Sequence, residues 1–266
     1  MSSRTIIQHA HGYAVILGEL TQNDLHRHYS LHLAMGLERS LPVMVDDATR
    51  EARTDQREVS GALVLDSWIE HRIGRPESGG ALILSPGPVS RIGLNLRSWL
   101  GSRGSAQLTD DPVDRIRLFA RSFLTGETSA AELCRALEGA LAVLSPGPVR
   151  PERYDPRILK ALGMIAGHVD GFLPATRVAG DVGLSEGRFL HLFREQTGMS
   201  YRRMQLWIRL ARAFSAVGSG RSLTEVAYEY GFADSAHFSR AFRQAFGMAP
   251  SVLIHDSRFV QVGPEG

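Results

Sequence analysis

Short apolar runs, separated by Gly, Pro, Asp and Ser, characterise the first hundred residues of the chain. They include YAVIL at 13–17, a patch at 41–45, GALVL at 61–65 and GALIL at 80–84. Runs of four to six residues with turn-forming residues between them predict β-strands of a sandwich or a small barrel.

Apolar positions change to a helical period between Pro112 and Leu144. They recur three or four residues apart, at Ile116, Phe119 and Phe123 and then at Leu133, Leu137, Leu141 and Leu144. This spacing predicts amphipathic helices, and their stripe has two open interpretations: a homodimer interface or a packing face within one chain. After Asp155 the pattern is helical almost throughout, and Pro156 suits the first turn of a helix.

Four prolines and a glycine interrupt both patterns in SPGPVRPERYDP, residues 145–156. These residues disfavour helix and strand alike, so the segment is the best linker candidate in the chain. A length of 266 residues also suits two domains better than one.

An internal repeat occupies the helical half. FLHLFREQTGM at 189–199 returns as FSRAFRQAFGM at 238–248, and VAGDVGL at 178–184 returns as VAYEYGF at 226–232. Each copy contains a small residue, a turn glycine and a capping side chain: Ala179, Gly183 and Ser185 in the first, and Ala227, Gly231 and Asp234 or Ser235 in the second. Glycine adopts a left-handed turn without strain and the cap starts a second helix, so each copy predicts a helix-turn-helix. The alternative is two ordinary helical hairpins without a DNA role.

The helical half resembles the DNA-binding domain of AraC/XylS-family transcription regulators over residues 156–255. The agreement runs through LSEGRFLHLFREQTGMSYRRMQLWIRLARA and SLTEVAYEYGFADSAHFSRAFRQAFGMAPS. The resemblance implies seven helices, with two helix-turn-helix units bridged by one long helix at 201–217. Two recognition helices on one bridge would enter successive major grooves, about 34 Å apart.

The resemblance also implies DNA-contacting residues on both recognition helices. The base-reading positions fall at Gly187, Leu190 and His191 in the first helix and at Ser235, Ala236, Ser239 and Arg240 in the second. Phosphate contacts are expected from Arg194, Arg202, Arg203 and Arg243, and the wider interface adds Ser185, Arg188 and His237. Arg240 can bind a guanine edge with two hydrogen bonds, whereas Gly187 and Leu190 depart from the polar residues common in the family. The first helix is therefore expected to specify fewer bases.

Histidines concentrate in the first half, where six of the ten lie between residues 9 and 71. His26, His28 and His32 share parity, so on one strand they would point to the same face, and His71 ends another strand-like segment. The pattern resembles the cupin-type N-terminal domain of the same regulators. A metal-binding cupin has a glutamate where this chain has His32.

Three interpretations of these histidines stay open. The first is a pocket for a small organic effector, with effector-binding residues His26, His28, Trp68 and His71. The second is a metal site drawn from His26, His28, His32 and His71, because imidazoles suit Zn²⁺, Ni²⁺ or Fe²⁺. The third is a structural barrel whose histidines are satisfied by hydrogen bonds. No cofactor is expected.

Charge adds a local rather than a global signal. The chain has 30 basic and 28 acidic residues, and Lys160 is its single lysine. Residues 1–150 hold 16 basic and 17 acidic side chains, a net charge of −1, and the remainder hold 14 and 11, a net charge of +3. Phosphate contacts by a few arginines are therefore expected to give modest, salt-sensitive affinity for DNA, which a second protomer would strengthen.

Several classes of protein are excluded. No apolar run approaches the roughly 18 residues that span a bilayer, and the N-terminus lacks a signal-peptide pattern. Cys134 is the only cysteine, so a disulfide framework is excluded. Its place beside Leu133 and Leu137 indicates a buried helical residue rather than a nucleophile. No nucleophile motif, phosphate loop or zinc-protease helix occurs, so we expect a soluble cytoplasmic protein that is not an enzyme.

Together these patterns predict an α+β two-domain protein: a cupin-like β-barrel with flanking helices, and an all-α domain with two helix-turn-helix motifs. The expected boundaries are 1–145 for a sensory and dimerisation domain, 146–155 for a linker, 156–256 for the DNA-binding domain and 257–266 for a tail. The expected function is a sequence-specific, effector-responsive transcriptional regulator, an activator that binds double-stranded DNA as a homodimer and recruits RNA polymerase. The alternative is a cupin-type metal-dependent enzyme or a metal sensor acting through the N-terminal histidines.

Overall fold

The computed structural model of the chain divides it into two units, residues 1–148 with 246–266 and residues 149–245. The residues that the structure describes are 4–9, 12–20, 25–28, 30–38, 40–46, 54–87, 90–144, 154–168, 171–218, 220–246, 249–255 and 257–263. The expected linker therefore lies outside the described residues, apart from Tyr154 and Asp155.

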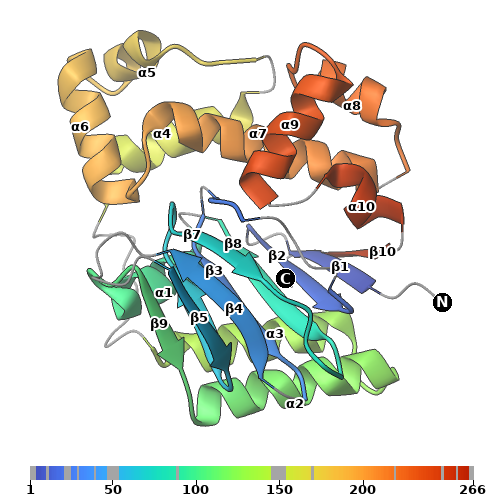
Figure 1. Cartoon of the computed structure of the whole chain (residues 1–266). Helices are drawn as coiled ribbons and strands as arrows, with labels where there is room; N and C mark the ends of the chain where they lie inside the picture. The colour runs from blue at the N-terminus through green and yellow to red at the C-terminus, as the bar shows by residue number, and fades with distance from the viewer. Residues whose placement is uncertain are drawn as a thin grey trace. The chain divides into compact units, whose positions relative to one another are not determined.

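The described residues of the first unit form two β-sheets and four helices (Figure 1). Its strands are β1 (Arg4–His9), β2 (Tyr13–Gly18), β3 (His32–Gly36), β4 (Leu41–Asp46), β5 (Thr54–Val59), β6 (Ala62–Leu65), β7 (Glu70–Ile73), β8 (Ala81–Pro86), β9 (Ser105–Leu108) and β10 (Ser257–Val262). Its helices are α1 (Arg91–Leu100), α2 (Asp111–Thr125), α3 (Ala130–Ala142) and α10 (Pro250–His255). The predicted strands at 13–17, 41–45, 61–65 and 80–84 are confirmed as β2, β4, β6 and β8.

The strands form layers rather than the expected closed barrel. One sheet has the order β10-β1-β2-β8-β3-β6-β9 and the other has the order β5-β4-β7. The small sheet packs on one face of the large sheet, where Val43 and Val45 of β4 belong to the same buried apolar cluster as Leu63 of β6. The other face carries α1, α2 and α3, with Leu96 and Leu137 in its core. Apolar runs predict that strands are buried, but they do not predict whether a sheet closes into a barrel. β6 and β8 are buried along their whole length because they lie between two layers.

The apolar stripe predicted at 112–144 packs within the chain. Ile116, Leu133, Leu137 and Leu141 are fully buried, and the other members of the stripe are partly buried against the same core. Of the two interpretations, the packing face is therefore confirmed for these side chains.

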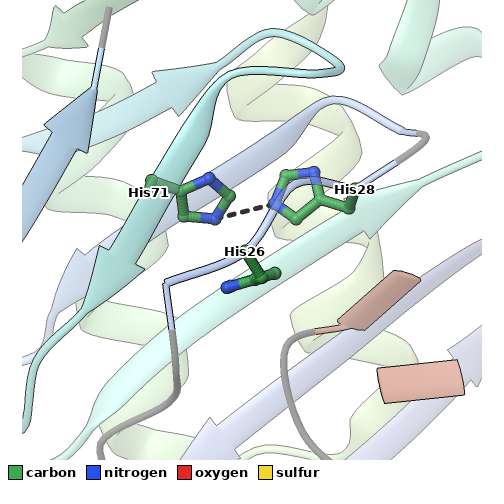
Figure 2. A group of neighbouring side chains, drawn as sticks. All are labelled: His26, His28 and His71. Atoms are coloured by element: carbon green, nitrogen blue, oxygen red, sulfur yellow. Dashed lines mark hydrogen bonds between the residues drawn. The ribbon is translucent and has the colours of Figure 1, made fainter. Parts of the chain in front are cut away.

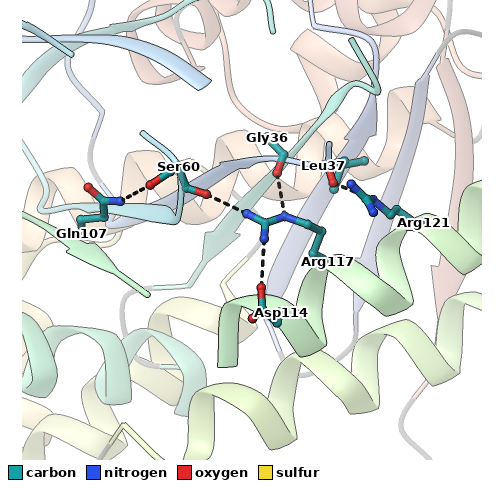
Figure 3. A network of polar contacts seen from close by, with 7 residues as sticks. All are labelled: Gly36, Leu37, Ser60, Gln107, Asp114, Arg117 and Arg121. Carbon is teal, nitrogen blue, oxygen red and sulfur yellow. Dashed lines mark hydrogen bonds and ion pairs between the residues drawn. The ribbon is translucent and has the colours of Figure 1, made fainter. Parts of the chain in front are cut away.

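Two arginines fix α2 against the strand ends (Figure 3). Arg117 donates from Nε to the Gly36 carbonyl at 3.3 Å and from Nη2 to the Ser60 carbonyl at 2.8 Å. Arg121 donates from Nε to the Leu37 carbonyl at 2.6 Å. These bonds satisfy carbonyls at the end of β3 and in the turn between β5 and β6, so α2 is held to the sheet by polar contacts as well as by its stripe.

The residues expected as a C-terminal tail form a strand. β10 runs parallel to β1, with Phe259 opposite Ile6, and Gln261 Nε2 donates to Gln8 Oε1 at 2.7 Å. Val260 packs against the core of the first unit. The chain therefore returns to the first unit after the second unit ends at residue 245.

The second unit is helical throughout its described elements. They are α4 (Pro156–Gly167), α5 (Ala175–Asp181), α6 (Glu186–Thr197), α7 (Tyr201–Gly218), α8 (Leu223–Glu229) and α9 (Ser235–Phe246), whose last residue clusters with the first unit. α7 matches the predicted bridge helix to within one residue, and α5–α6 and α8–α9 match the two predicted helix-turn-helix pairs.

Candidate nucleic-acid interface and histidine cluster

The first helix-turn-helix is formed by α5 and α6. Gly183 in the turn has a φ of +71°, the left-handed conformation predicted for it, and the Leu184 N–H donates to the Ala179 carbonyl at 2.9 Å. Ser185 caps α6, and its Oγ accepts a hydrogen bond from the Arg188 N–H at 3.4 Å. The small buried Ala179 and the turn glycine therefore have the roles predicted from the sequence.

The second helix-turn-helix repeats this backbone in α8 and α9. Gly231 has a φ of +72°, and the Phe232 N–H donates to the Ala227 carbonyl at 2.8 Å. Asp234 is the one of the two predicted caps that starts α9, because its Oδ1 accepts from the His237 N–H at 2.5 Å. The glycine and methionine that end this copy, at 247 and 248, lie outside the described residues.

Aromatic side chains attach both recognition helices to α7. Phe189 and Phe193 of α6 are fully buried, with ring centroids 5.1 and 5.4 Å from that of Tyr201 at the start of α7. Phe242 of α9 is fully buried, 5.0 Å from Phe214 near the other end of α7. Tyr201 and Phe214 are 13 residues apart, which corresponds to about 20 Å along a helix. The repeated phenylalanines therefore hold one recognition helix near each end of the bridge.

Arg209 on α7 fixes the turn of the second helix-turn-helix. Its Nη1 donates to the Gly231 carbonyl at 3.2 Å, and its guanidinium lies 5.2 Å from the centre of the Phe232 ring. A Cβ on Gly231 would lie 3.1 Å from the Cα of Gly171, in the segment before α5. The turn is thus packed between the bridge helix and the other half of the unit. No local pattern in the sequence distinguishes Arg209 from the other 28 arginines.

The predicted DNA-contacting residues share an outward orientation. Exposed in the first half are Ser185, Gly187, Arg188, Leu190, His191, Arg194, Arg202 and Arg203. Exposed in the second half are Ala236, His237, Arg240 and Arg243, while Ser235 and Ser239 are half-buried. The phenylalanines expected on the inner faces are buried at 189, 193, 238 and 242 and half-buried at 246.

Three of these side chains have distinctive local surroundings. Leu190 is 38% exposed, although it is a large apolar residue on a polar face. The His237 ring accepts at Nδ1 from the Ala233 N–H at 3.2 Å, so the neutral ring carries its hydrogen on Nε2, as a donor. His191 Nε2 lies 4.0 Å from Glu195 Oε2, and both side chains are exposed.

The predicted histidine cluster is present in the first unit, but not on one strand as expected. His26 pairs with His71 of β7 through an isolated two-residue bridge, His28 is in irregular backbone, and His32 begins β3. Ring centroids of His26 and His28 lie 4.4 and 4.3 Å from that of His71 (Figure 2), and those of His28 and His32 are 3.4 Å apart. The backbone at His26, His28 and His32 brings these rings close to His71, although the expectation that they share one strand was wrong.

Hydrogen bonds orient the rings of His28, His71 and His32. His28 Nδ1 donates to the Ser30 carbonyl at 2.7 Å, and His71 Nδ1 donates to the Ile69 carbonyl at 2.9 Å. His32 Nε2 lies 2.9 Å from Ser85 Oγ. Burial, followed by the neighbouring rings, lowers the pKa of His28 and His71, in the latter case to about 3. The pair is therefore neutral.

Trp68 lies beside the cluster but contributes its backbone rather than a buried ring. Its N–H donates to the His28 carbonyl at 3.0 Å, while its side chain is 36% exposed. Its φ of +71° is unusual for a bulky residue. The same turn contains Asp66, which is 3.0 Å from Arg97 of α1. The turn thus connects the histidine cluster with a helix on the outer layer.

Cys134 is buried in α3, as predicted. Burial raises the pKa of its thiol, which keeps the sulfur protonated and unreactive. No helix in the described part of the chain is both long and apolar enough to cross a membrane.

Comparison with known proteins identifies the second unit. A helix-turn-helix domain family matches residues 178–255. The activator RhaS of Pectobacterium carotovorum is 40% identical over 72 residues, 26% of either chain. The regulator GlxA of Rhizobium meliloti is 33% identical over 99 residues, 37% of this chain and 31% of its own. The arabinose operon regulatory protein of Salmonella typhimurium is 33% identical over 99 residues, 36% of this chain and 35% of its own.

These matches confirm the resemblance to the AraC/XylS family: the C-terminal region is a DNA-binding helix-turn-helix domain of the AraC type. The chain aligns with only about a quarter to a third of the length of these relatives. RhaS is named as a transcriptional activator, GlxA as a transcriptional regulator and the third relative as an operon regulatory protein.

Solved structures extend the likeness to the whole fold. An apo variant of ToxT from Vibrio cholerae superposes with a TM-score of 0.62 over 92% of this chain and 97% of its own, at 11% identity. A second ToxT structure gives 0.56 over 95% and 97%, at 13% identity. At this identity the likeness shows the fold alone, a layered sheet unit followed by the helical unit.

Proposed function

We propose that the chain is a sequence-specific transcriptional regulator whose second unit binds double-stranded DNA. The observation that supports this best is the pair of equivalent recognition helices near the two ends of α7. Each presents an exposed polar face while its phenylalanines are buried against the bridge. A recognition helix of this kind inserts its N-terminal residues into a major groove.

The two helices divide the work of recognition. Ser235, Ala236, Ser239 and Arg240 read base edges from α9, with Arg240 binding guanine O6 and N7. Gly187, Leu190 and His191 do so from α6, where Leu190 contacts a thymine methyl group. The phosphate backbone is bound by Arg194, Arg202, Arg203 and Arg243, with Ser185, Arg188 and His237 at the helix starts. The His237 Nε2–H suits a phosphate oxygen.

The first unit is proposed to bind a small ligand at the histidine cluster, His26, His28 and His71, beside Trp68. Support comes from the turn that connects this cluster with α1 and from ToxT, which has been solved with an unsaturated fatty acid bound. The protein would act in the cytoplasm as a homodimer and as an activator that recruits RNA polymerase. Leu118 and Leu124 on the outer face of α2 are exposed and available to a second copy.

Selection of binding sites from random DNA by the purified full-length chain tests the proposal. Enrichment of a motif with two half-sites one helical turn apart is expected, because the recognition helices share one bridge. The control is the variant Arg240→Ala/Leu190→Ala, which alters both faces and should lose the motif while it keeps its helical content. Recovery of no enriched sequence, with or without ligand, would overturn the proposal.

A further inference from the structure

The two most buried rings of the histidine cluster make an unfavourable contact as neutral groups. His28 Nε2 and His71 Nε2 lie 2.9 Å apart. The Nδ1 atom of each ring faces a backbone carbonyl, which can only accept, so each Nδ1 must carry the ring hydrogen. Both Nε2 atoms are then unprotonated, and their lone pairs point at each other. Two acceptors at hydrogen-bond distance repel unless a positive charge lies between or beside them.

A proton is a poor source of that charge. His28 and His71 are both fully buried, and an imidazolium there would lose its hydration. Neighbouring imidazoles on His26 and His32 offer no negative charge to compensate it. A metal ion resolves the contact differently, because it binds both lone pairs at once and needs the rings neutral.

A third ring completes the set of donors. The ligand nitrogens of His26, His28 and His71 all lie within 4.8 Å of one another. Tetrahedral coordination with Zn–N bonds of 2.0–2.1 Å places such nitrogens about 3.3 Å apart. Small side-chain rotations therefore bring the three rings onto one ion. The carbonyls that accept from the two Nδ1–H groups then fix the tautomer and the ring orientation, as outer-shell partners of metal-bound histidines do.

We infer that His26, His28 and His71 form a binding site for one divalent transition metal of the zinc class, and that this metal is the ligand sensed by the first unit. Three imidazoles select Zn²⁺, Co²⁺ or Ni²⁺ over Mg²⁺ and Ca²⁺, which prefer oxygen. His32 stacks on His28 and is directed to Ser85, so it supports the site rather than binding the ion. The fourth position remains for water or an anion. The sensing role rests on the proposed function.

The structure also offers a route from the site to the rest of the unit. The Trp68 N–H holds the His28 carbonyl, and the left-handed φ of Trp68 sets the direction of that turn. Asp66 in the same turn binds Arg97 of α1. A change in the spacing of His28 and His71 on metal binding would therefore act on both the turn and α1.

The test uses full-length protein purified without a histidine tag. Metal analysis and Zn²⁺ titration should give one tight equivalent, and Co²⁺ should give the visible absorption of a tetrahedral site. His71→Gln and His26→Gln should weaken Zn²⁺ binding by at least about 100-fold, since even outer-shell changes cost 10–100-fold. The matched variant is His32→Gln, which keeps a polar partner for Ser85. Because His32 is not a ligand, this variant should still bind one equivalent and should lose less affinity than His71→Gln. Circular dichroism checks that all variants fold.

Several outcomes decide between the possibilities. Less than about 0.2 equivalents on the wild-type chain, or equal loss in His32→Gln and His71→Gln, overturns the site. One equivalent that leaves operator affinity unchanged between Zn²⁺ and chelator overturns the sensing role. A change in operator affinity with Zn²⁺ that is absent in His71→Gln supports both. Failure of the proposed function is distinct, because it shows as no enriched DNA motif while the Zn²⁺ stoichiometry stays at one.

Discussion

The two helix-turn-helix units have the same backbone but differ in what surrounds it. Their turn glycines, Gly183 and Gly231, have φ values of +71° and +72°. Among the described residues, no neighbour lies within 4 Å of a Cβ placed on Gly183, whereas a Cβ on Gly231 would meet Gly171 and Arg209. The repeated sequence therefore produces the same backbone in both helix-turn-helix motifs. The residues packed around each motif determine how firmly its turn is held.

The recognition helices α6 and α9 also differ in the side chains that they present to DNA. The first helix-turn-helix, whose turn is loosely surrounded, presents Gly187 and Leu190, which can distinguish few bases. The second, whose turn is tightly packed, presents Arg240. Precise hydrogen bonding to a base edge requires a rigid platform, and apolar contact with a methyl group tolerates small shifts. We therefore propose that the second helix-turn-helix sets the sequence preference and that the first adds affinity.

The largest effect is expected from removing the buried phenylalanines that attach both helix-turn-helix motifs to α7. Phe193→Ala and Phe242→Ala should each lower the free energy of unfolding by about 3–5 kcal/mol, because each empties a fully buried ring position against α7. Urea denaturation followed by tryptophan fluorescence measures the loss. The control is Tyr228→Ala, whose side chain is 69% exposed and should change little. A small loss of unfolding free energy at only one of the two phenylalanines would show that the two recognition helices are not packed equivalently against α7.

A second prediction separates the two turns. Alanine at Gly183 should cost about 1–2 kcal/mol, because the left-handed conformation is strained by a Cβ. Alanine at Gly231 carries the same strain and adds a contact 3.1 Å from the Gly171 Cα, so its cost should exceed that of Gly183→Ala by about 1 kcal/mol or more. Equal losses in urea denaturation would mean that the surroundings of Gly231 yield freely.

The third prediction tests the division of recognition. Arg240→Ala should weaken binding to the preferred DNA site by about 1–3 kcal/mol and relax the preference at one base pair. Leu190→Ala should cost less, because only a methyl contact is lost. Fluorescence anisotropy on matched and mismatched duplexes measures both, with Arg115→Ala on α2 as the charge-matched control. Equal weakening on every sequence would place Arg240 among the phosphate contacts.

The repeat explains why the second unit was predictable from the sequence. Local signals such as Gly183, Ser185 and the i, i+4 phenylalanines determine each helix-turn-helix, and the bridge lies between two copies of known register. The positions of Gln205 and Arg209 were not predictable. Gln205 bonds both polar groups of the Leu173 backbone, and Arg209 binds Gly231, but their partners are 22 to 32 residues away.

The first unit shows where local patterns stop. The apolar runs predicted four strands correctly, but they carry no information on the partner of each strand, so the layered sheets were mistaken for a barrel. β5, with the sequence TDQREV, has almost no apolar signal and is defined by its pairing with β4. β10 pairs with a strand some 250 residues away. The helix α1 was missed although Ile92, Leu96 and Leu100 have helical spacing.

The smallest expected effect concerns the capping of the two units. Ser222 starts α8 with a reciprocal capping box, in which its Oγ accepts from the Glu225 N–H and the Glu225 carboxylate accepts from the Ser222 N–H. Ser185 makes a single 3.4 Å bond to the N–H of Arg188, which has no carboxylate to return. Ser222→Ala should therefore cost about 1 kcal/mol and Ser185→Ala roughly half as much in urea denaturation. The reverse order would mean that the first helix-turn-helix depends on its cap more strongly than the second. Ser185 would then stabilise the fold rather than contact DNA.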